Sequence, residues 1–314
     1  MQTMDGLLVI DKAAGVTSHD VVAGARRILK ERRVGHTGTL DPFATGVLLV
    51  LVGRATRLAQ FLSGSDKEYD AIIRLGYATD TGDRTGNPIP GPHGSADPLR
   101  TGRWSEEEIE QALASLRGWI DQVPPMYSAK KIGGKKLYEL ARRGEEVKRE
   151  PVQVCIHELE AIRPDGQLVK DNLDGTFDFH VHVVCSAGTY VRALAKDFGK
   201  RLSVGAHLAE LRRTRVGDFN VTNAVTLEQL KTSFGEEAIG TMLLRPSAAL
   251  SRLPFVHLSD EDVRRARHGM EVKVGETAWS DGEKVKMCDA NDHLIAIGDY
   301  DATTKRLHPS VVLA

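Results

Sequence analysis

Apolar positions along this chain follow two spacings, one typical of buried strands and one typical of a helix. Short apolar runs at residues 7–10 and 47–52 suit strands that are buried on both faces. Between them, residues 21–29 place apolar side chains at helical spacing, and Thr17 or Ser18 can cap that helix. The N-terminal part therefore predicts strand, helix, loop and strand in succession.

The middle of the chain continues with mixed elements. Ser105 and Glu108 form a capping-box start for a helix, and Gly144 is a normal end for a helix over 135–143. We also expect strands at 69–75 and 177–183, a helix at 190–201 and a long loop at 80–103. These elements agree with an α+β fold, but they do not give its topology.

The pattern of apolar and polar residues changes after Pro246. Ser259 can cap a short helix that ends at Gly269. Four brief strand-like runs follow, at 271–274, 284–288, 293–298 and 311–313. This pattern predicts a small, mostly β module of about 60 residues with a boundary near residues 246–254.

Charge is distributed unevenly, although the formal net charge of the 314 residues is only −1. Residues 22–36 hold five basic residues and one acidic, 117–150 hold nine and five, and 192–217 hold seven and two. Residues 251–314 reverse the sign, with nine basic and eleven acidic. Any one basic segment can be a solvated helix face, but three together favour a surface that meets phosphates.

Composition restricts the class of protein further. The three cysteines are sparse and far apart, which argues against a disulfide framework and points to a reducing compartment. No run approaches the ~18 apolar residues of a membrane span, and the first residues lack a basic signal-peptide region. We therefore expect a cytoplasmic protein that does not associate with a membrane.

Phosphate-loop, dinucleotide-binding and nucleophile-elbow motifs are all missing from the sequence. His180 and His182 can share one strand face, but no cysteine or carboxylate pair with ligand spacing accompanies them. The sequence therefore predicts no metal site, and the chemistry is expected to rest on ordinary side chains.

The most unusual stretch is Gly35–Gly46, where glycines and threonines surround the single carboxylate of Asp41. Pro42 restricts Asp41 to extended geometry, and glycines allow the backbone to approach a ligand closely. An Asx-Pro turn, in which Asp41 bonds its own backbone, explains the same residues equally well. Residue physics leaves both interpretations open.

This stretch resembles the catalytic motif of the TruB family, the bacterial tRNA pseudouridine-55 synthases. Further segments fit the same family in the same order over about residues 6–250, namely 8–19, 67–69, 79–82, 124–130, 134–142, 185–192 and 205–213. Two departures are Ala13, where the family usually has proline, and a loop at 83–103 that is longer than expected. Neither touches a proposed catalytic group.

The resemblance implies a mixed, largely antiparallel central sheet flanked by helices, the pseudouridine synthase fold, for residues 1–250. It places a thumb-like RNA-binding insertion at about 124–150 and a PUA-like domain at 251–314. It implies tRNA as the partner, bound through the T-stem-loop, with no cofactor and no obligatory protein partner. The expected reaction converts uridine 55 to pseudouridine after base flipping.

The resemblance also assigns roles to individual residues. Asp41, Tyr69 and Arg192 are expected to be catalytic, with Arg192 paired to Asp41 and Tyr69 stacked on the target base. The residues expected to bind substrate or RNA are His36, Lys12, Tyr190, Leu211, Lys130, Lys135, Lys136 and Arg142.

Two alternatives remain open. One is a guide-RNA-dependent synthase of the archaeal and eukaryotic type, against which the intact segment through Gly144 argues. The other is an RNA-binding or RNA-folding factor of the same fold. The joint presence of Asp41, Tyr69 and Arg192 argues against that role as the sole function.

Overall fold

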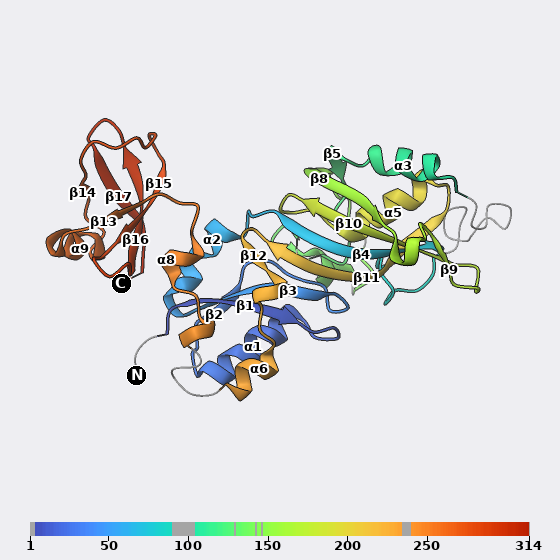
Figure 1. The fold of residues 1–314 in the computed structure, drawn as a ribbon, viewed down its shortest axis with the longest axis horizontal. Helices are drawn as coiled ribbons and strands as arrows, with labels where there is room; N and C mark the ends of the chain where they lie inside the picture. Colours follow the sequence, from blue (N-terminus) through green and yellow to red (C-terminus); the bar gives the residue numbers. More distant parts are fainter. Residues whose placement is uncertain are drawn as a thin grey trace.

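The computed structural model describes residues 4–89, 104–128, 130–141, 143–145, 147–233 and 240–313. A large sheet runs through the first 250 residues, and a smaller sheet follows (Figure 1). In spatial order, the main strands of the large sheet are β1 (Gly6–Lys12), β3 (Thr45–Val52), β11 (Gly205–Val216), β4 (Lys67–Gly76), β10 (Phe177–Cys185), β8 (Val152–Ile162) and β5 (Gly118–Gln122). Short strands β2 (Val34–His36), β12 (Phe219–Asn220) and β9 (Lys170–Asp171) pair with β3, β11 and β10.

Every neighbouring pair along the main path is antiparallel except β3 and β11, which run parallel. The parallel contact joins Thr45 to Arg212 and Gly46 to Arg213. It brings the first 50 residues against a strand more than 160 residues further along the chain. The expected mixed, largely antiparallel sheet is thereby confirmed.

Helices cover the two halves of the large sheet. α1 (Ser18–Leu29) and α6 (Leu227–Thr232) lie against the β1–β3 half, while α5 (Val191–Arg201) and α3 (Glu106–Ala114) lie at the other half (Figure 1). Of the two predicted caps, Thr17 rather than Ser18 caps α1, through a capping box with Asp20, and the capping box predicted at Ser105 is formed. The other short helices described before the C-terminal module are η1 (Gly53–Leu58), α2 (Ala59–Leu62), α4 (Leu137–Ala141), η2 (Pro164–Gly166), η3 (Val221–Asn223) and α8 (Pro246–Ala249).

The continuous apolar runs of β1 and β3 are explained by burial on both faces. Leu8 and Leu48 pack with the apolar face of α1, whereas Leu7 and Leu49 share a cluster with α8 and the C-terminal module. β4 instead alternates. Tyr69 and Ala71 join the core beneath α5, and Asp70 between them is only partly buried.

The C-terminal sheet has the order β13 (Phe255–His257), β15 (Lys284–Cys288), β16 (Leu294–Asp301), β17 (Arg306–Val312) and β14 (Val272–Lys273). Its helix, α9 (Asp260–Arg267), is capped by Ser259 as predicted. The sequence did not predict β13, and the last strand begins earlier than expected, at Arg306. The small, mostly β module is confirmed, whereas the boundary after residue 250 and the PUA-like assignment stay predictions.

One predicted helix is wrong in its first part. Lys135 and Lys136 do not begin a helix but form β7 (Lys135–Lys136), which pairs with β6 (Lys131–Ile132). Gly133 and Gly134 between them both have positive φ, at 57° and 81°, as a two-residue hairpin turn requires. The helix is confined to α4. The predicted loop at 80–103 lies outside the described residues from 90 onward.

Among the described residues, no helix is long and apolar enough to cross a membrane.

Candidate active site

Asp41 lies in the loop between β2 and β3, and this loop is held from both sides. The main-chain oxygen of Asp41 accepts from the Ala44 amide at 3.1 Å, so the backbone does make a turn here. The carboxylate, however, bonds Arg192 rather than its own turn. The structure therefore separates the two interpretations that the sequence left open.

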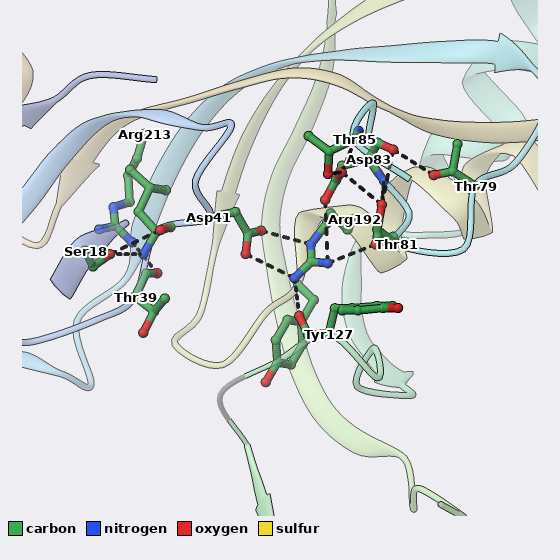
Figure 2. A network of polar contacts seen from close by, with 12 residues as sticks. Ser18, Thr39, Asp41, Thr79, Thr81, Asp83, Thr85, Tyr127, Arg192 and Arg213 are labelled. Carbon is green, nitrogen blue, oxygen red and sulfur yellow. Dashed lines mark hydrogen bonds and ion pairs between the residues drawn. The ribbon is translucent and has the colours of Figure 1, made fainter. Parts of the chain in front are cut away.

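Arg192 stands in the first turn of α5, and its side chain is 5% exposed. It meets the carboxylate side-on, with Nε 2.9 Å from Oδ2 and Nη2 3.1 Å from Oδ1 of Asp41. The same guanidinium donates to the carbonyls of Thr81 at 2.9 Å and Tyr127 at 2.7 Å (Figure 2). A planar donor held by four contacts fixes the direction of the Asp41 carboxylate.

Asp83 is a second carboxylate beside Arg192, and its Oδ2 lies 3.7 Å from Nη1. Three threonines hold the Asp83 loop: Thr81 and Thr85 donate to the Asp83 carboxylate, and Thr79 donates to its carbonyl. We did not single out Asp83 from the sequence. The segment that carried the family resemblance, Thr79–Gly82, ends one residue before Asp83.

The electrostatic balance at Asp41 has opposing contributions. Burial raises the pKa of Asp41 above its ordinary value, while the Arg192 guanidinium lowers it and the Asp83 carboxylate raises it. Lys12 also lowers the pKa of Asp41, although more weakly. The guanidinium is therefore the main group that opposes the rise in the pKa of Asp41.

Lys12 is 1% exposed, and burial lowers its pKa to about 8. Its ammonium donates to the carbonyls of Ala13 and Val16 at 2.9 Å and of Pro42 at 3.3 Å. These contacts tie the end of β1 to the residue after Asp41. The direct RNA contact expected of Lys12 stays a prediction.

Tyr69 is 6% exposed and stands opposite Arg213 in the β4–β11 pairing. Burial raises the pKa of Tyr69, and the Arg213 guanidinium opposes that rise. Arg213 also donates to the carbonyls of Val47, Thr39 and Gly38, so one buried arginine joins β11 to the Asp41 loop. Only glycine fits at Gly46, because a Cβ there would lie 2.1 Å from the Arg213 carbonyl oxygen.

The structure also describes three other residues that were predicted to contact the substrate: Leu211, His36 and Tyr190. Leu211 shares the buried cluster of Tyr69, Leu40 and Phe43, so the structure brings it to the Asp41 side. The His36 ring packs edge-on to His19 at 5.6 Å, and burial lowers the pKa of His36. Tyr190 is the N-cap residue of α5, two positions before Arg192.

Three of the basic residues predicted to grip RNA, Lys130, Lys135 and Lys136, lie at the hairpin of β6 and β7. Lys135 is exposed on β7, and the carbonyl of Lys130 accepts from the Leu137 amide at 2.8 Å. The Lys136 side chain and Arg142 lie outside the described part of the chain. Among the described residues, no group of three or more His, Cys, Asp or Glu side chains is placed to hold a metal ion.

Comparison with known proteins defines the class. The fold matches a chain of the crystal structure of a Cbf5–Nop10–Gar1 complex with a TM-score of 0.71 and 28% identity, over 98% of this chain and 85% of the other. A chain of an H/ACA RNP bound to a substrate RNA containing 2′-deoxyuridine gives the same TM-score at 26% identity, with the same coverage of both chains.

The family follows from the sequence. Residues 26–191 match the N-terminal domain of the TruB family pseudouridylate synthases, and residues 192–249 match the tRNA pseudouridylate synthase B C-terminal domain. A protein of Symbiobacterium thermophilum named tRNA pseudouridine synthase B is 48% identical over 85% of this chain and 83% of its own length. One of Solibacter usitatus with that name is 39% identical over 99% of this chain and 100% of its own length.

This chain belongs to the TruB family. It is therefore a pseudouridine synthase, an isomerase, as the resemblance of its motifs implied.

Proposed function

We propose that this enzyme converts uridine 55 in the T-loop of tRNA to pseudouridine, with Asp41 as the catalytic carboxylate. The observation that carries the proposal is the side-on contact between Asp41 and Arg192 within a loop that is fixed from several elements. The relatives named tRNA pseudouridine synthase B, at 39–48% identity, support tRNA as the substrate.

The reaction breaks the N1–C1′ glycosidic bond, rotates the uracil and joins C5 to C1′, after which the C5 proton leaves. Asp41 has an oxygen nucleophile that needs no metal or activating base while it is ionised. It can attack C1′, add to the base or assist elimination from the sugar. In each case Arg192 favours the ionised carboxylate and directs it, and Tyr69 offers a ring for stacking on the base.

A uridine inside a folded RNA loop must be flipped out before Asp41 reaches it, at a cost of a few kcal/mol. His36 and Leu211 are the side chains proposed to receive the flipped nucleotide, one by stacking and one as an apolar wall. The basic hairpin with Lys130, Lys135 and Lys136, and Arg142 after it, is proposed to hold the T-stem-loop by its phosphates.

The test is to incubate unmodified tRNA with the purified protein alone and to map pseudouridine along the product. We expect one new pseudouridine, at position 55, without added cofactor or guide RNA. Modification that appears only with a guide RNA would move the protein to the guide-dependent class. If the protein binds tRNA but forms no pseudouridine either with or without a guide RNA, the result would favour an RNA-folding factor.

Removal of the charges of Lys135 and Lys136 is expected to weaken tRNA binding and to flatten its dependence on salt. For every phosphate that a lysine no longer neutralises, the slope of log K against log salt falls in magnitude by about 0.7–0.9. The measurement is tRNA affinity of the double alanine variant across a salt series. Lys231→Ala on α6, whose lysine is exposed and paired with Glu228, is the matched control. An unchanged slope in the double variant would mean that these lysines face solvent in the complex.

A further inference from the structure

Ser18 contacts the backbone just before the catalytic aspartate. It is 1% exposed at the start of α1. Its Oγ accepts from the Leu40 amide at 2.9 Å and donates to the Leu40 carbonyl at 3.1 Å (Figure 2). One hydroxyl therefore satisfies both polar groups of the residue that precedes Asp41. The position of Asp41 is thus tied to the N-terminus of a helix from outside its loop.

Gln122 makes the corresponding contact on the arginine side. It is 2% exposed at the end of β5. Its Oε1 accepts from the Tyr190 amide at 2.7 Å, and its Nε2 donates to the Tyr190 carbonyl at 3.1 Å. Tyr190 is the N-cap of α5 but makes no side-chain cap bond of its own. Gln122 therefore fixes the point at which the helix that carries Arg192 begins.

The two contacts share one form. In each, a single buried side chain from another element bonds both the N–H and the C=O of one residue, next to Asp41 in one case and two positions before Arg192 in the other. A buried two-way bond of this kind resists both translation and rotation of the peptide, because its loss takes the partner from the Leu40 amide and carbonyl or from the Tyr190 amide. The Tyr190 carbonyl also accepts from the Ala193 and Leu194 amides, so on that side the bond to the amide matters most. Between the two anchored points lies the side-on ion pair, whose contacts of 2.9 and 3.1 Å leave little room for displacement.

We propose that Ser18 and Gln122 are positioning residues that set the separation and orientation of Asp41 and Arg192. This inference rests on the catalytic role of Asp41 proposed above. Neither residue touches the reacting atoms in this arrangement, and each acts through the backbone it holds. Their loss displaces the carboxylate or the guanidinium without removing either group, so the chemical step suffers more than tRNA binding.

Ser18→Ala and Gln122→Leu test this directly in the full-length enzyme. We expect single-turnover rates at saturating tRNA to fall by about 10- to 100-fold, since displacements near 1 Å have effects of that order. The tRNA dissociation constant should change by less than about threefold, because the phosphate-binding residues are untouched. A fall in tRNA affinity that accounts for the lower activity would overturn the proposal.

Thr176→Val is the matched control for reduced stability. Thr176 is 6% exposed and directly precedes Phe177, the first residue of β10. Its hydroxyl donates to Asp174 and accepts from Asn172. This variant also loses a buried hydroxyl but not an anchor of the ion pair. With all variants assayed well below their unfolding temperatures, Thr176→Val should keep the wild-type rate. An equal loss of rate in this control would reduce Ser18 and Gln122 to general structural roles.

Gln122→Glu supplies a readout that stability alone does not. A protonated glutamic acid restores both contacts, since its carbonyl accepts from the Tyr190 amide and its hydroxyl donates to the Tyr190 carbonyl. The ionised form accepts only and repels that carbonyl. We therefore expect the rate of the variant, relative to the wild type at the same pH, to rise as pH falls through the pKa of the new carboxyl group. A ratio that stays flat or declines with falling pH contradicts the proposal.

The failure of this inference is distinguishable from failure of the proposed function. If Asp41→Asn is inactive while Ser18→Ala and Gln122→Leu keep the wild-type rate, only the positioning roles fail. If Asp41→Asn retains substantial activity, the proposed catalytic role fails first. A crystal structure of Gln122→Leu adds evidence that is independent of activity. Contacts between Asp41 and Arg192 that remain as close as 2.9 and 3.1 Å would overturn the proposal.

Discussion

Asp41→Asn is expected to abolish pseudouridine formation while tRNA binding survives. The asparagine side chain keeps nearly the same volume and one acceptor oxygen toward Arg192, but it has no anionic oxygen to attack C1′, add to the base or assist elimination. Loss of a nucleophile that acts as part of a catalytic unit commonly reduces the rate by about 10⁴-fold or more. The measurement is single-turnover formation of pseudouridine in tRNA that is labelled at the target uridine.

The control for this variant is tRNA affinity, which should stay close to that of the wild type because the exposed basic hairpin is unchanged. Asp70→Asn is a matched substitution on the same sheet. Asp70 lies on β4 next to Tyr69 in sequence, but its carboxylate bonds His182 at 2.8 Å rather than Arg192. It should retain most of the activity. Substantial turnover by Asp41→Asn would remove Asp41 from the mechanism.

Those elements whose signals are local were predictable from the sequence. Helix α1 was predicted from its apolar spacing and from a capping residue at Thr17 or Ser18, signals that lie within a few residues of each other, and Thr17 is the cap. β11 was not predicted, although it occupies the middle of the sheet. Its second half carries Arg212, Arg213 and Arg215, which belong to one of the three basic segments that favoured a phosphate-facing surface. Their partners, Asp11, the Val47 carbonyl and Glu68, come from three other strands and are visible only in the fold.

The candidate site divides in the same way. Asp41 was detectable because its loop has an unusual composition, and Arg192 entered through the family motif. The contacts of Ser18, Gln122 and Asp83 escaped because a buried serine, glutamine or aspartate has no distinctive pattern in a sequence, and Ser18 was noted only as a possible helix cap. Their importance arises from contacts with residues 22, 68 and 109 positions away along the chain. Nothing local specifies those contacts.

Arg192 also joins the ion pair to the proposed RNA-binding segment. Its Nη2 donates to the Tyr127 carbonyl, and Tyr127 precedes the hairpin of β6 and β7 by only a few residues. A movement of the hairpin on binding tRNA would therefore reach the guanidinium through one backbone contact. This link gives substitutions at Arg192 two separable effects, one on the charge beside Asp41 and one on the geometry of the site.

Arg192→Met and Arg192→Lys separate these two effects. Methionine removes the positive charge, so the pKa of Asp41, already raised by burial, is expected to rise further. Less of the carboxylate is then ionised at a given pH, and the acid limb of the rate profile moves to higher pH. The maximal rate should fall by about 10²- to 10³-fold, as is usual when a buried electrostatic contact is removed.

Lysine keeps the charge but not the fork that meets both carboxylate oxygens, since an ammonium acts as a point charge. We therefore expect Arg192→Lys to show an acid limb near that of the wild type with a lower plateau. The measurement is the single-turnover rate of each variant between pH 5 and 9, divided by the folded fraction of that variant. This normalisation is needed because loss of the buried arginine also removes the donor to the Thr81 and Tyr127 carbonyls, which lowers stability. An acid limb that does not move in Arg192→Met would mean that another group controls the ionisation of Asp41. Coincident profiles for the two variants would mean that geometry, rather than charge, is the whole contribution of Arg192.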